Sequence, residues 1–180
     1  MATSNPQDDP AQAAYDEGLR YETGALRWED EGNTKVPHDQ DNTKAIECYQ
    51  RSADAGNADG MAGLGRLKFL WGYGDAERDD AQALALFERS AAAGSGFGLA
   101  LLGTMHFRGT GGVDGGRRDE KKALALFKRS AEKGHPEGVA RLGMMYEEGR
   151  AGLRRDEGKA LKLYRQSAAK GWGYGQARLG

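Results

Sequence analysis

Cysteine, proline and long apolar runs are scarce in this 180-residue chain, and each scarcity excludes a class of protein. The single cysteine, Cys48, cannot form a disulfide within the chain, which argues against a disulfide-rich secreted scaffold. No apolar run approaches the roughly 20 residues needed to cross a bilayer, and the mean hydropathy is −0.75. Residues 1–30 hold no apolar core of a secretory signal. We therefore expect a cytoplasmic, reducing environment and no direct membrane insertion.

Glycine is abundant by contrast, with 28 residues against four prolines, and it recurs with a long period. Collagen is excluded because no three-residue period is present. Three motifs return together: a helix-forming segment led by alanine, a Leu-Gly pair, and Gly-x-x-x-Gly-x-Ala. They begin at Ala45, Ala83, Ala123 and Ala160; at Leu64, Leu102, Leu142 and Leu179; and at Gly56, Gly94, Gly134 and Gly171. All three sets are spaced by 38, 40 and 37 residues, which is typical of a repeat protein.

Each repeat predicts two helices, which we call helix A and helix B. Helix B begins after a capping aspartate and ends at a glycine, where the left-handed conformation is accessible. The aspartates are Asp41, Asp79, Asp119 and Asp156, and the glycines are Gly56, Gly94, Gly134 and Gly171. Glycine inside a helix costs about 1 kcal/mol relative to alanine. The recurring Gly65, Gly103 and Gly143 of helix A therefore predict close approach of a neighbouring helix.

The first repeat has two interpretations. Either residues 25–39 are an insertion between its two helices, or helix A continues through Trp28 to Glu31.

The pattern Ala-x-Leu-Gly-x-x-Tyr-x-x-Gly at residues 140–149, followed by a helix of the form Asp-x-x-x-Ala that ends in Ser-Ala-x-x-Gly, resembles the Sel-1-like repeat (SLR). That family is related to the tetratricopeptide repeat. The resemblance covers about residues 11–180, and Lys68 and His106 depart from it at the tyrosine position. It implies an all-α, right-handed αα superhelix (solenoid) of stacked antiparallel helix pairs with a period of 37–40 residues.

We assign repeats to residues 11–56, 57–94, 95–134 and 135–171, with a truncated fifth unit at 172–180 and a disordered segment at 1–10. The last unit ends inside a helix A without the polar cap that the end of a solenoid needs. We therefore expect a fragment of a longer array, or a last repeat that is covered, including by self-association.

Catalytic, metal and cofactor patterns are weak throughout. Ser52, Ser90, Ser130 and Ser167 share one repeat position, which favours packing against the next helix over catalysis. His38 and His135 lie in predicted loops, and Cys48 occupies a core position of the repeat. The glycine-rich run at 109–116 follows a helix, so we interpret it as a flexible connector and not as a phosphate-binding loop. Asp39 and Asp41 lack the glycine of a calcium loop. We predict no catalytic residue, metal or cofactor.

Charge is distributed unevenly along the chain. Residues 1–60 carry 13 acidic and 5 basic side chains, whereas residues 61–180 carry 14 and 21. A candidate basic edge consists of arginines next to the capping aspartates: Arg78, Arg117, Arg118, Arg154 and Arg155. It is either a solvated rim or a surface that steers an acidic partner. We expect no nucleic-acid binding, because exposed aromatics do not alternate with the bases and the pI is about 6.3.

The SLR resemblance implies a non-catalytic protein-interaction scaffold that binds a protein or peptide along the groove lined by helix A. Its candidate contact residues lie one before, three after and six after the repeated leucine: Leu67, Leu70, Met105, Arg108, Arg141, Met145, Glu148 and Arg178. The methionines either contact a peptide or fill space between helices. One alternative is the regulatory or docking portion of a larger enzyme or complex. A hydrolase is less favoured, because the family members with that activity pair cysteines within each repeat.

Overall fold

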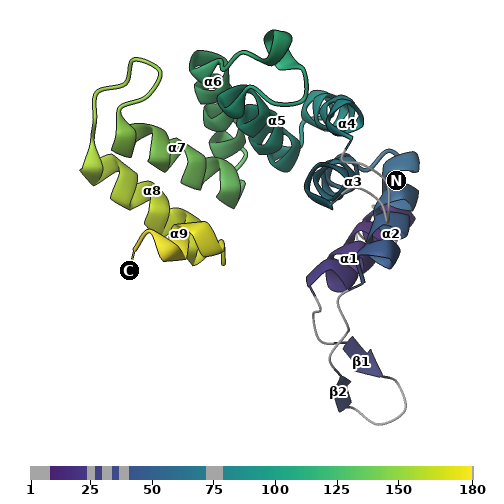
Figure 1. Cartoon of the computed structure of the whole chain (residues 1–180). Helices are drawn as coiled ribbons and strands as arrows, with labels where there is room; N and C mark the ends of the chain where they lie inside the picture. Colours follow the sequence, from purple (N-terminus) through teal and green to yellow (C-terminus); the bar gives the residue numbers. More distant parts are fainter. Residues whose placement is uncertain (1–8, 24–26, 30–33, 37–40, 72–78, 180) are drawn as a thin grey trace, which may run out of the picture. The chain divides into compact units, whose positions relative to one another are not determined.

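Nine α-helices, one 3₁₀ turn and a two-stranded hairpin make up the part of the chain that the computed structural model describes, residues 9–23, 27–29, 34–36, 41–71 and 79–179 (Figure 1). The helices are α1 (Pro10–Thr23), α2 (Asn42–Asp54), α3 (Ala58–Trp71), α4 (Asp80–Ala92), α5 (Gly96–Arg108), α6 (Glu120–Glu132), α7 (Pro136–Glu148), α8 (Glu157–Ala169) and α9 (Gly173–Ala177). The 3₁₀ turn η2 spans Val113–Gly116. The predicted all-α fold of helix pairs is confirmed, with the hairpin as an addition.

The chain divides into two compact units, an N-terminal unit of residues 1–79 and a C-terminal unit of residues 80–180. In the N-terminal unit α2 packs on α1 and α3, and α1 also contacts α3. In the C-terminal unit each helix from α4 to α9 packs on the next, and α7 contacts both α5 and α9. Helices A of successive repeats therefore touch one another directly within each unit.

Helix B has the boundaries that the sequence predicts wherever its caps are described. The Asp119 carboxylate accepts a hydrogen bond of 2.8 Å from the Lys122 amide, and Asp41 and Asp156 make the equivalent bond. The terminating glycines adopt positive φ, as at Gly134 with +74°. An L-residue rarely adopts that conformation, so glycine ends the helix at the least free-energy cost.

The capping aspartate also fixes helix B to the end of the preceding helix A. The Asp156 amide donates to the carbonyl of Tyr146 at 2.9 Å, and the Asp41 amide donates to the carbonyl of Tyr21 at 3.0 Å. Because this bond joins the two ends of the A-to-B loop, the residues between them vary in number without moving the helices.

The first repeat shows that freedom. Helix α1 ends at Thr23, and strands β1 (Arg27–Glu29) and β2 (Thr34–Val36) pair antiparallel, with Arg27 opposite Val36. The insertion interpretation is confirmed, and the continuation of the helix through Trp28 is wrong because that residue lies in β1.

The repeated serine packs between two helices A, as the sequence analysis expects. Ser130 Oγ donates to the carbonyl of Gly96 in α5 at 2.6 Å, and Ser52 and Ser167 make the equivalent bond to Ala11 and Pro136. On its other side lies Gly138 of α7, where a Cβ atom would sit 2.0 Å from Ser130 Oγ. The serine hydroxyl therefore needs both a carbonyl on one helix and a glycine on the next.

The glycine of the Leu-Gly pair lies against an aromatic ring of helix B. A Cβ at Gly103 would be 2.7 Å from Phe127 Cε1, and a Cβ at Gly143 would be 3.0 Å from Tyr164 Cε1. The predicted close approach is confirmed at these two positions. In the C-terminal unit Phe127 belongs to a buried cluster that includes Met144 and Met145.

The glycine-rich run at 109–116 packs on the helix that precedes it. It forms η2, and the Val113 side chain is 5% exposed. A Cβ at Gly111 would lie 2.1 Å from Met105 Cε, so the loop packs directly on α5. Five of its glycines have positive φ: Gly109, Gly111, Gly112, Gly115 and Gly116. These conformations let the backbone fold onto the helix, a packing that the prediction of a flexible connector does not include.

Cys48 lies in the core of the N-terminal unit. Its side chain is buried beside the fully buried Tyr49, which confirms its core position, and burial raises the pKa of the thiol.

Among the described residues, no helix combines the length and the hydropathy that a membrane crossing requires.

Candidate functional site

The predicted groove residues fall into buried and exposed groups. Leu67, Met105 and Met145 are 0%, 1% and 0% exposed, so the prediction that they face outward is wrong. The physical reason is that successive helices A contact each other, which encloses the position three residues after the leucine. Of the two interpretations of the methionines, interhelix packing is confirmed. The Leu70 side chain lies outside the described residues.

Helix A of the C-terminal unit exposes little surface away from its ends. Every residue from Phe97 to His106 in α5 is buried. In α7, Arg141 is half-buried, pairs with Glu137 at 3.3 Å and lies over the Tyr174 ring at 5.6 Å. The exposed candidates are instead at the helix ends: Arg108 in α5, Glu148 in α7, and Arg178 directly after α9.

The arginines of the candidate basic edge are exposed where the structure describes them. Arg117, Arg118, Arg154 and Arg155 all present their side chains to solvent, and Arg78 lies outside the described residues. Arg155 forms an ion pair of 2.6 Å with Glu157. The ion pairs found within the described ranges engage none of Arg108, Arg117, Arg118 or Arg154.

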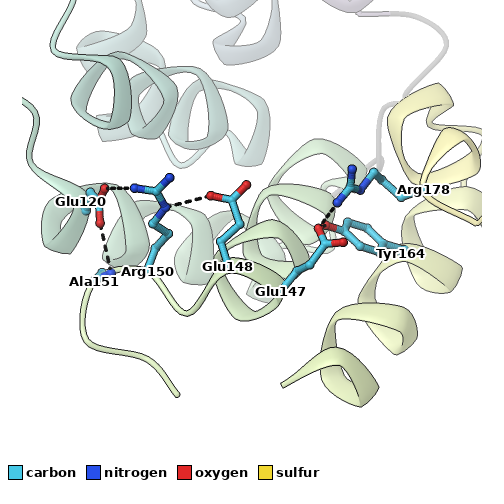
Figure 2. A network of polar contacts seen from close by, with 7 residues as sticks. All are labelled: Glu120, Glu147, Glu148, Arg150, Ala151, Tyr164 and Arg178. Atoms are coloured by element: carbon cyan, nitrogen blue, oxygen red, sulfur yellow. Dashed lines mark hydrogen bonds and ion pairs between the residues drawn. The ribbon is translucent and has the colours of Figure 1, made fainter. Parts of the chain in front are cut away.

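In the C-terminal unit an ion-pair network joins the start of α6 to the end of α7 and to the loop that follows α7 (Figure 2). Arg150 Nη1 lies 3.0 Å from Glu120 Oε1, and Arg150 Nε donates to Glu148 at 2.8 Å. The second oxygen of Glu120 accepts from the Ala151 amide at 3.3 Å. Glu120 follows the first arginine pair in sequence and Arg150 precedes the second, so this network links the two segments that hold the pairs. We call Arg108, Arg117, Arg118, Arg154 and Arg155 the loop edge.

An open cavity of about 610 Å³ lies at this edge. Arg154, Arg155 and Lys159 line it together with Tyr146 and Asp156. The Asp156 carboxylate already accepts a hydrogen bond of 2.9 Å from the backbone amide of Lys159 and lies 3.4 Å from the ammonium group of that lysine. The hydrogen bond from the backbone amide is the main cause of the lowered pKa of Asp156. The remaining charges at the cavity are therefore predominantly positive, which favours anionic groups.

Two polar trios, which the sequence analysis missed, join consecutive helices. In the C-terminal unit Tyr164 Oη donates to Glu147 at 2.7 Å, and Arg178 pairs with the same carboxylate (Figure 2). In the N-terminal unit Tyr49, Glu22 and Arg66 repeat this arrangement. Arg178 holds the pKa of Glu147 below its usual value, and burial raises the pKa of Tyr164 well above its own.

The repeat alignment carried a signal for these trios. Tyrosine of helix B coincides with glutamate four residues after the helix-A glycine, as in Tyr164 and Glu147. In the second and third repeats both of these positions hold phenylalanine instead. In the third repeat Phe107 packs against the cluster that contains Phe127. The trios join consecutive helices through hydrogen bonds and ion pairs.

The histidines have packing positions. His135 stacks on Phe97 with ring centroids 5.0 Å apart and meets the edge of Trp172 at 6.4 Å, an aromatic column that the prediction of a loop residue missed. His106 is buried in α5, and His38 lies outside the described residues. Across the described ranges, no group of three or more His, Cys, Asp or Glu side chains is placed to hold a metal ion.

Comparison with known proteins identifies the repeat. The family model described as "Sel1 repeat" matches residues 11–57, 58–95, 97–135 and 136–172. Comparison with curated proteins found no match. Among solved structures, c5321, a protective antigen of uropathogenic Escherichia coli with an SLR fold, is 28% identical with a TM-score of 0.57, covering 94% of this chain and 32% of that chain.

Two further structures are similar in fold. A Sel1 repeat protein from Oxalobacter formigenes is 23% identical with a TM-score of 0.60, covering 96% of this chain and 62% of that one. The immunity protein Pa5087 from Pseudomonas aeruginosa is 19% identical with a TM-score of 0.58, covering 92% and 54%. The chain thus spans between about a third and less than two thirds of the length of these structures.

Sel1 repeat proteins are generally protein-interaction scaffolds, and their fold is typically non-catalytic. The four matched repeats cover most of the sequence and coincide with the helix pairs described above. On this evidence, the chain belongs to the Sel1 repeat family.

Proposed function

We propose that this chain is a non-catalytic scaffold that binds an acidic protein or peptide through the loop edge. The observation that carries the proposal is that four exposed arginines of the loop edge, Arg108, Arg117, Arg118 and Arg154, form no ion pair with a described residue. Nearby charges are paired, as in the Arg150 network, so the edge combines a fixed framework with available guanidinium groups.

The chemistry of arginine suits this role. Its planar guanidinium presents several N–H donors that match a carboxylate in a bidentate geometry, and it stays charged at all accessible pH values. The C-terminal unit as a whole carries 18 basic and 11 acidic side chains, which adds a long-range attraction for an acidic surface.

The loop edge replaces the helix-A groove in this proposal. A groove contact needs exposed side chains along helix A, and α5 buries all residues from Phe97 to His106. The loops are also the usual place for binding residues on a rigid scaffold, because they tolerate changes that the packed helices do not.

A capture experiment with charge-matched variants tests the proposal. The immobilised chain is exposed to lysate of its native organism, and captured proteins are identified by mass spectrometry. Changing Arg117, Arg118 and Arg154 together to alanine is expected to lower the affinity for a specific partner about tenfold or more. The control changes Lys128, Lys162 and Arg165, exposed positions on α6 and α8, to alanine and removes the same charge. Equal loss in both variants, or none in either, would contradict the proposal.

The remaining alternatives have their own tests. A panel of ester and amide substrates tests the hydrolase alternative, and turnover that disappears on mutation of one named residue would contradict a non-catalytic role. A role as the docking portion of a larger enzyme or complex predicts that the native protein copurifies with that enzyme in a fixed ratio. We place the protein in a reducing compartment, in keeping with a buried, unpaired Cys48.

A further inference from the structure

A second cavity, of about 500 Å³, lies in the C-terminal unit between α4, α5 and α6, and its lining contains none of the loop-edge arginines. Its floor consists of Leu102 and His106 of α5 and Leu126 of α6, all of them buried. The exposed side chains of Glu88, Lys122 and Arg129 stand around its rim. This size is within the range of pockets that hold small ligands or peptide side chains.

The cavity is lined by His106, which stands where the first and fourth repeats have tyrosine. In the first and fourth repeats the tyrosine ring lies under the lysine of helix B, with Lys44 Nζ 5.4 Å from the Tyr21 ring centre and Lys159 Nζ 5.2 Å from that of Tyr146. Lys122 is the equivalent lysine, and it lines the cavity with the smaller imidazole of His106.

The glycine-rich loop closes one side of the same cavity. Gly112 and Val113 line it, and Val113 is buried. The left-handed glycines that fold this loop onto α5 are therefore part of the cavity wall. Two sequence features without a role so far, the histidine substitution and the long glycine run, meet at one place.

The cavity is lined by apolar side chains at its floor and mainly by positively charged side chains at its rim. Leu84, Leu102 and Leu126 provide apolar surface, and among the described side chains of the lining Lys122 and Arg129 outnumber the one acidic residue, Glu88. Within the described ranges Arg129 takes part in no ion pair. A ligand that matches this pattern places a large apolar group inside and a carboxylate against the rim.

We propose that this pocket binds a peptide segment in which a large apolar side chain stands next to an acidic residue. The inference rests on the proposed scaffold function and specifies the class of partner segment that this unit recognises. The apolar side chain enters between Leu84 and Leu126, and the adjacent carboxylate pairs with Arg129. Charge complementarity with a unit of 18 basic and 11 acidic residues favours such a segment over a basic one.

Three blocked peptides test the pocket directly on the full chain. They are Gly-Gly-Phe-Glu-Gly-Gly, the same peptide with lysine in place of glutamate, and the same peptide with alanine in place of phenylalanine, each acetylated and amidated. Binding is followed by two-dimensional NMR of the backbone amides. The first peptide is expected to shift the amides around His106, Lys122 and Arg129 saturably, with about tenfold or greater preference over the other two.

Variants locate the binding. His106→Tyr introduces the residue that the first and fourth repeats carry, so it is expected to fold, and its larger ring is expected to abolish binding by occupying the cavity. Arg129→Glu is expected to lower the affinity for the phenylalanine–glutamate peptide about tenfold and to raise the affinity for the lysine peptide. Arg165→Glu makes the same charge change at an exposed position on α8, outside the cavity, and is expected to leave binding unchanged.

Several outcomes would overturn the inference. These are equal binding of all three peptides, shifts confined to the loop edge, or binding that persists in the folded His106→Tyr variant. If that variant also keeps a protein partner that the loop-edge variant loses, the pocket is not the recognition site while the proposed function stands. Loss of the partner in both variants supports the two surfaces as parts of one interface.

Discussion

Single atoms decide how closely successive repeats pack, and glycine at the serine contact is the clearest case. A Cβ at Gly138 would lie 2.0 Å from Ser130 Oγ and 3.1 Å from the Ala131 backbone nitrogen. The backbone atom cannot rotate away, so an added methyl group must push the helices apart. The same contact recurs at Gly98 with Ser90 and at Gly60 with Ser52.

Gly138→Ala is therefore expected to destabilise the protein by about 2 kcal/mol, as overpacking of a close-packed interior does. Gly158→Ala is the control, because this glycine is exposed in α8 and a Cβ there meets only Asp156 at 3.5 Å. Alanine's helix propensity is expected to stabilise that variant by about 0.5–1 kcal/mol. Urea unfolding followed by circular dichroism measures both, and two changes of the same sign would contradict the packing argument.

The Glu147 carboxylate gives the stability a pH dependence. Because Arg178 lowers its pKa in the folded chain, the stabilisation is fully present above the unfolded value, near 4.5, and is lost as the pH falls through the lower folded pKa. We expect the thermal midpoint of the wild type to drop more steeply below pH 4.5 than that of Glu147→Gln. Identical acid profiles for the two proteins would show that this carboxylate is not coupled to folding.

At the scale of the helix, the bond between the capping aspartate and the preceding helix A separates loop length from helix placement. The Asp41 amide and the Asp156 amide make this bond across loops of different length. Residues 25–40 are therefore expected to be replaceable by residues 150–155 of the shorter loop, with the Thr23 end and the Asp41 cap retained. A loop change of this size alters closure entropy only slightly.

The measurement is the thermal midpoint and the helical circular dichroism of the exchanged protein. Both are expected to match the wild type, apart from the small contribution of the strands. A loss of cooperative unfolding would mean that the hairpin, and not the Asp41 bond, holds α1 against α2.

Much of the element structure was predictable from the sequence, because it depends on local rules. An aspartate that caps and a glycine with positive φ fix the boundaries of helix B, and both are visible at Asp119 and Gly134. The serine contact was predictable in kind, because four repeats share it. The hairpin and the packing of the 109–116 loop were not, because neither has a counterpart in the other repeats.

The candidate site was less predictable for a different physical reason. Whether Met105 faces solvent depends on how close the next helix A lies, and that distance is set by contacts that no single helix contains. The arginines next to the capping aspartates were found from sequence, since loop residues before a cap are usually exposed. The cavity at His106 was not predictable, because its lining comes from three helices and the folded 109–116 loop.

Over the whole molecule, charge separates by unit. Residues 1–79 carry 16 acidic and 8 basic side chains, whereas residues 80–180 carry 11 and 18. The near-neutral total therefore hides two units of opposite sign, and an acidic partner is attracted to only one of them. Attraction of this kind acts mainly on the encounter rate and is screened by salt.

Association with an acidic partner is thus expected to slow about tenfold or more between 50 and 300 mM salt, on the order of other steered encounters, while dissociation changes little. Surface plasmon resonance of the captured partner at several salt concentrations measures both rates. The loop-edge variant is expected to show a shallower dependence. A salt effect carried entirely by dissociation would place the charges inside the contact and not around it.

The Tyr–Glu and Phe–Phe junctions restrict which repeats can be neighbours in any rearranged array. A helix A with glutamate in its last turn, as at Glu147, offers a carboxylate to a tyrosine of helix B. A helix A with phenylalanine there, as at Phe107, offers apolar surface instead. Joining the first kind to a phenylalanine helix would strip the carboxylate of its hydroxyl donor, and joining the second kind to a tyrosine helix would bury that hydroxyl unmatched. Duplication or shuffling of these repeats is therefore expected to conserve the pairing, so the order of junction types along related arrays is a record of how they were assembled.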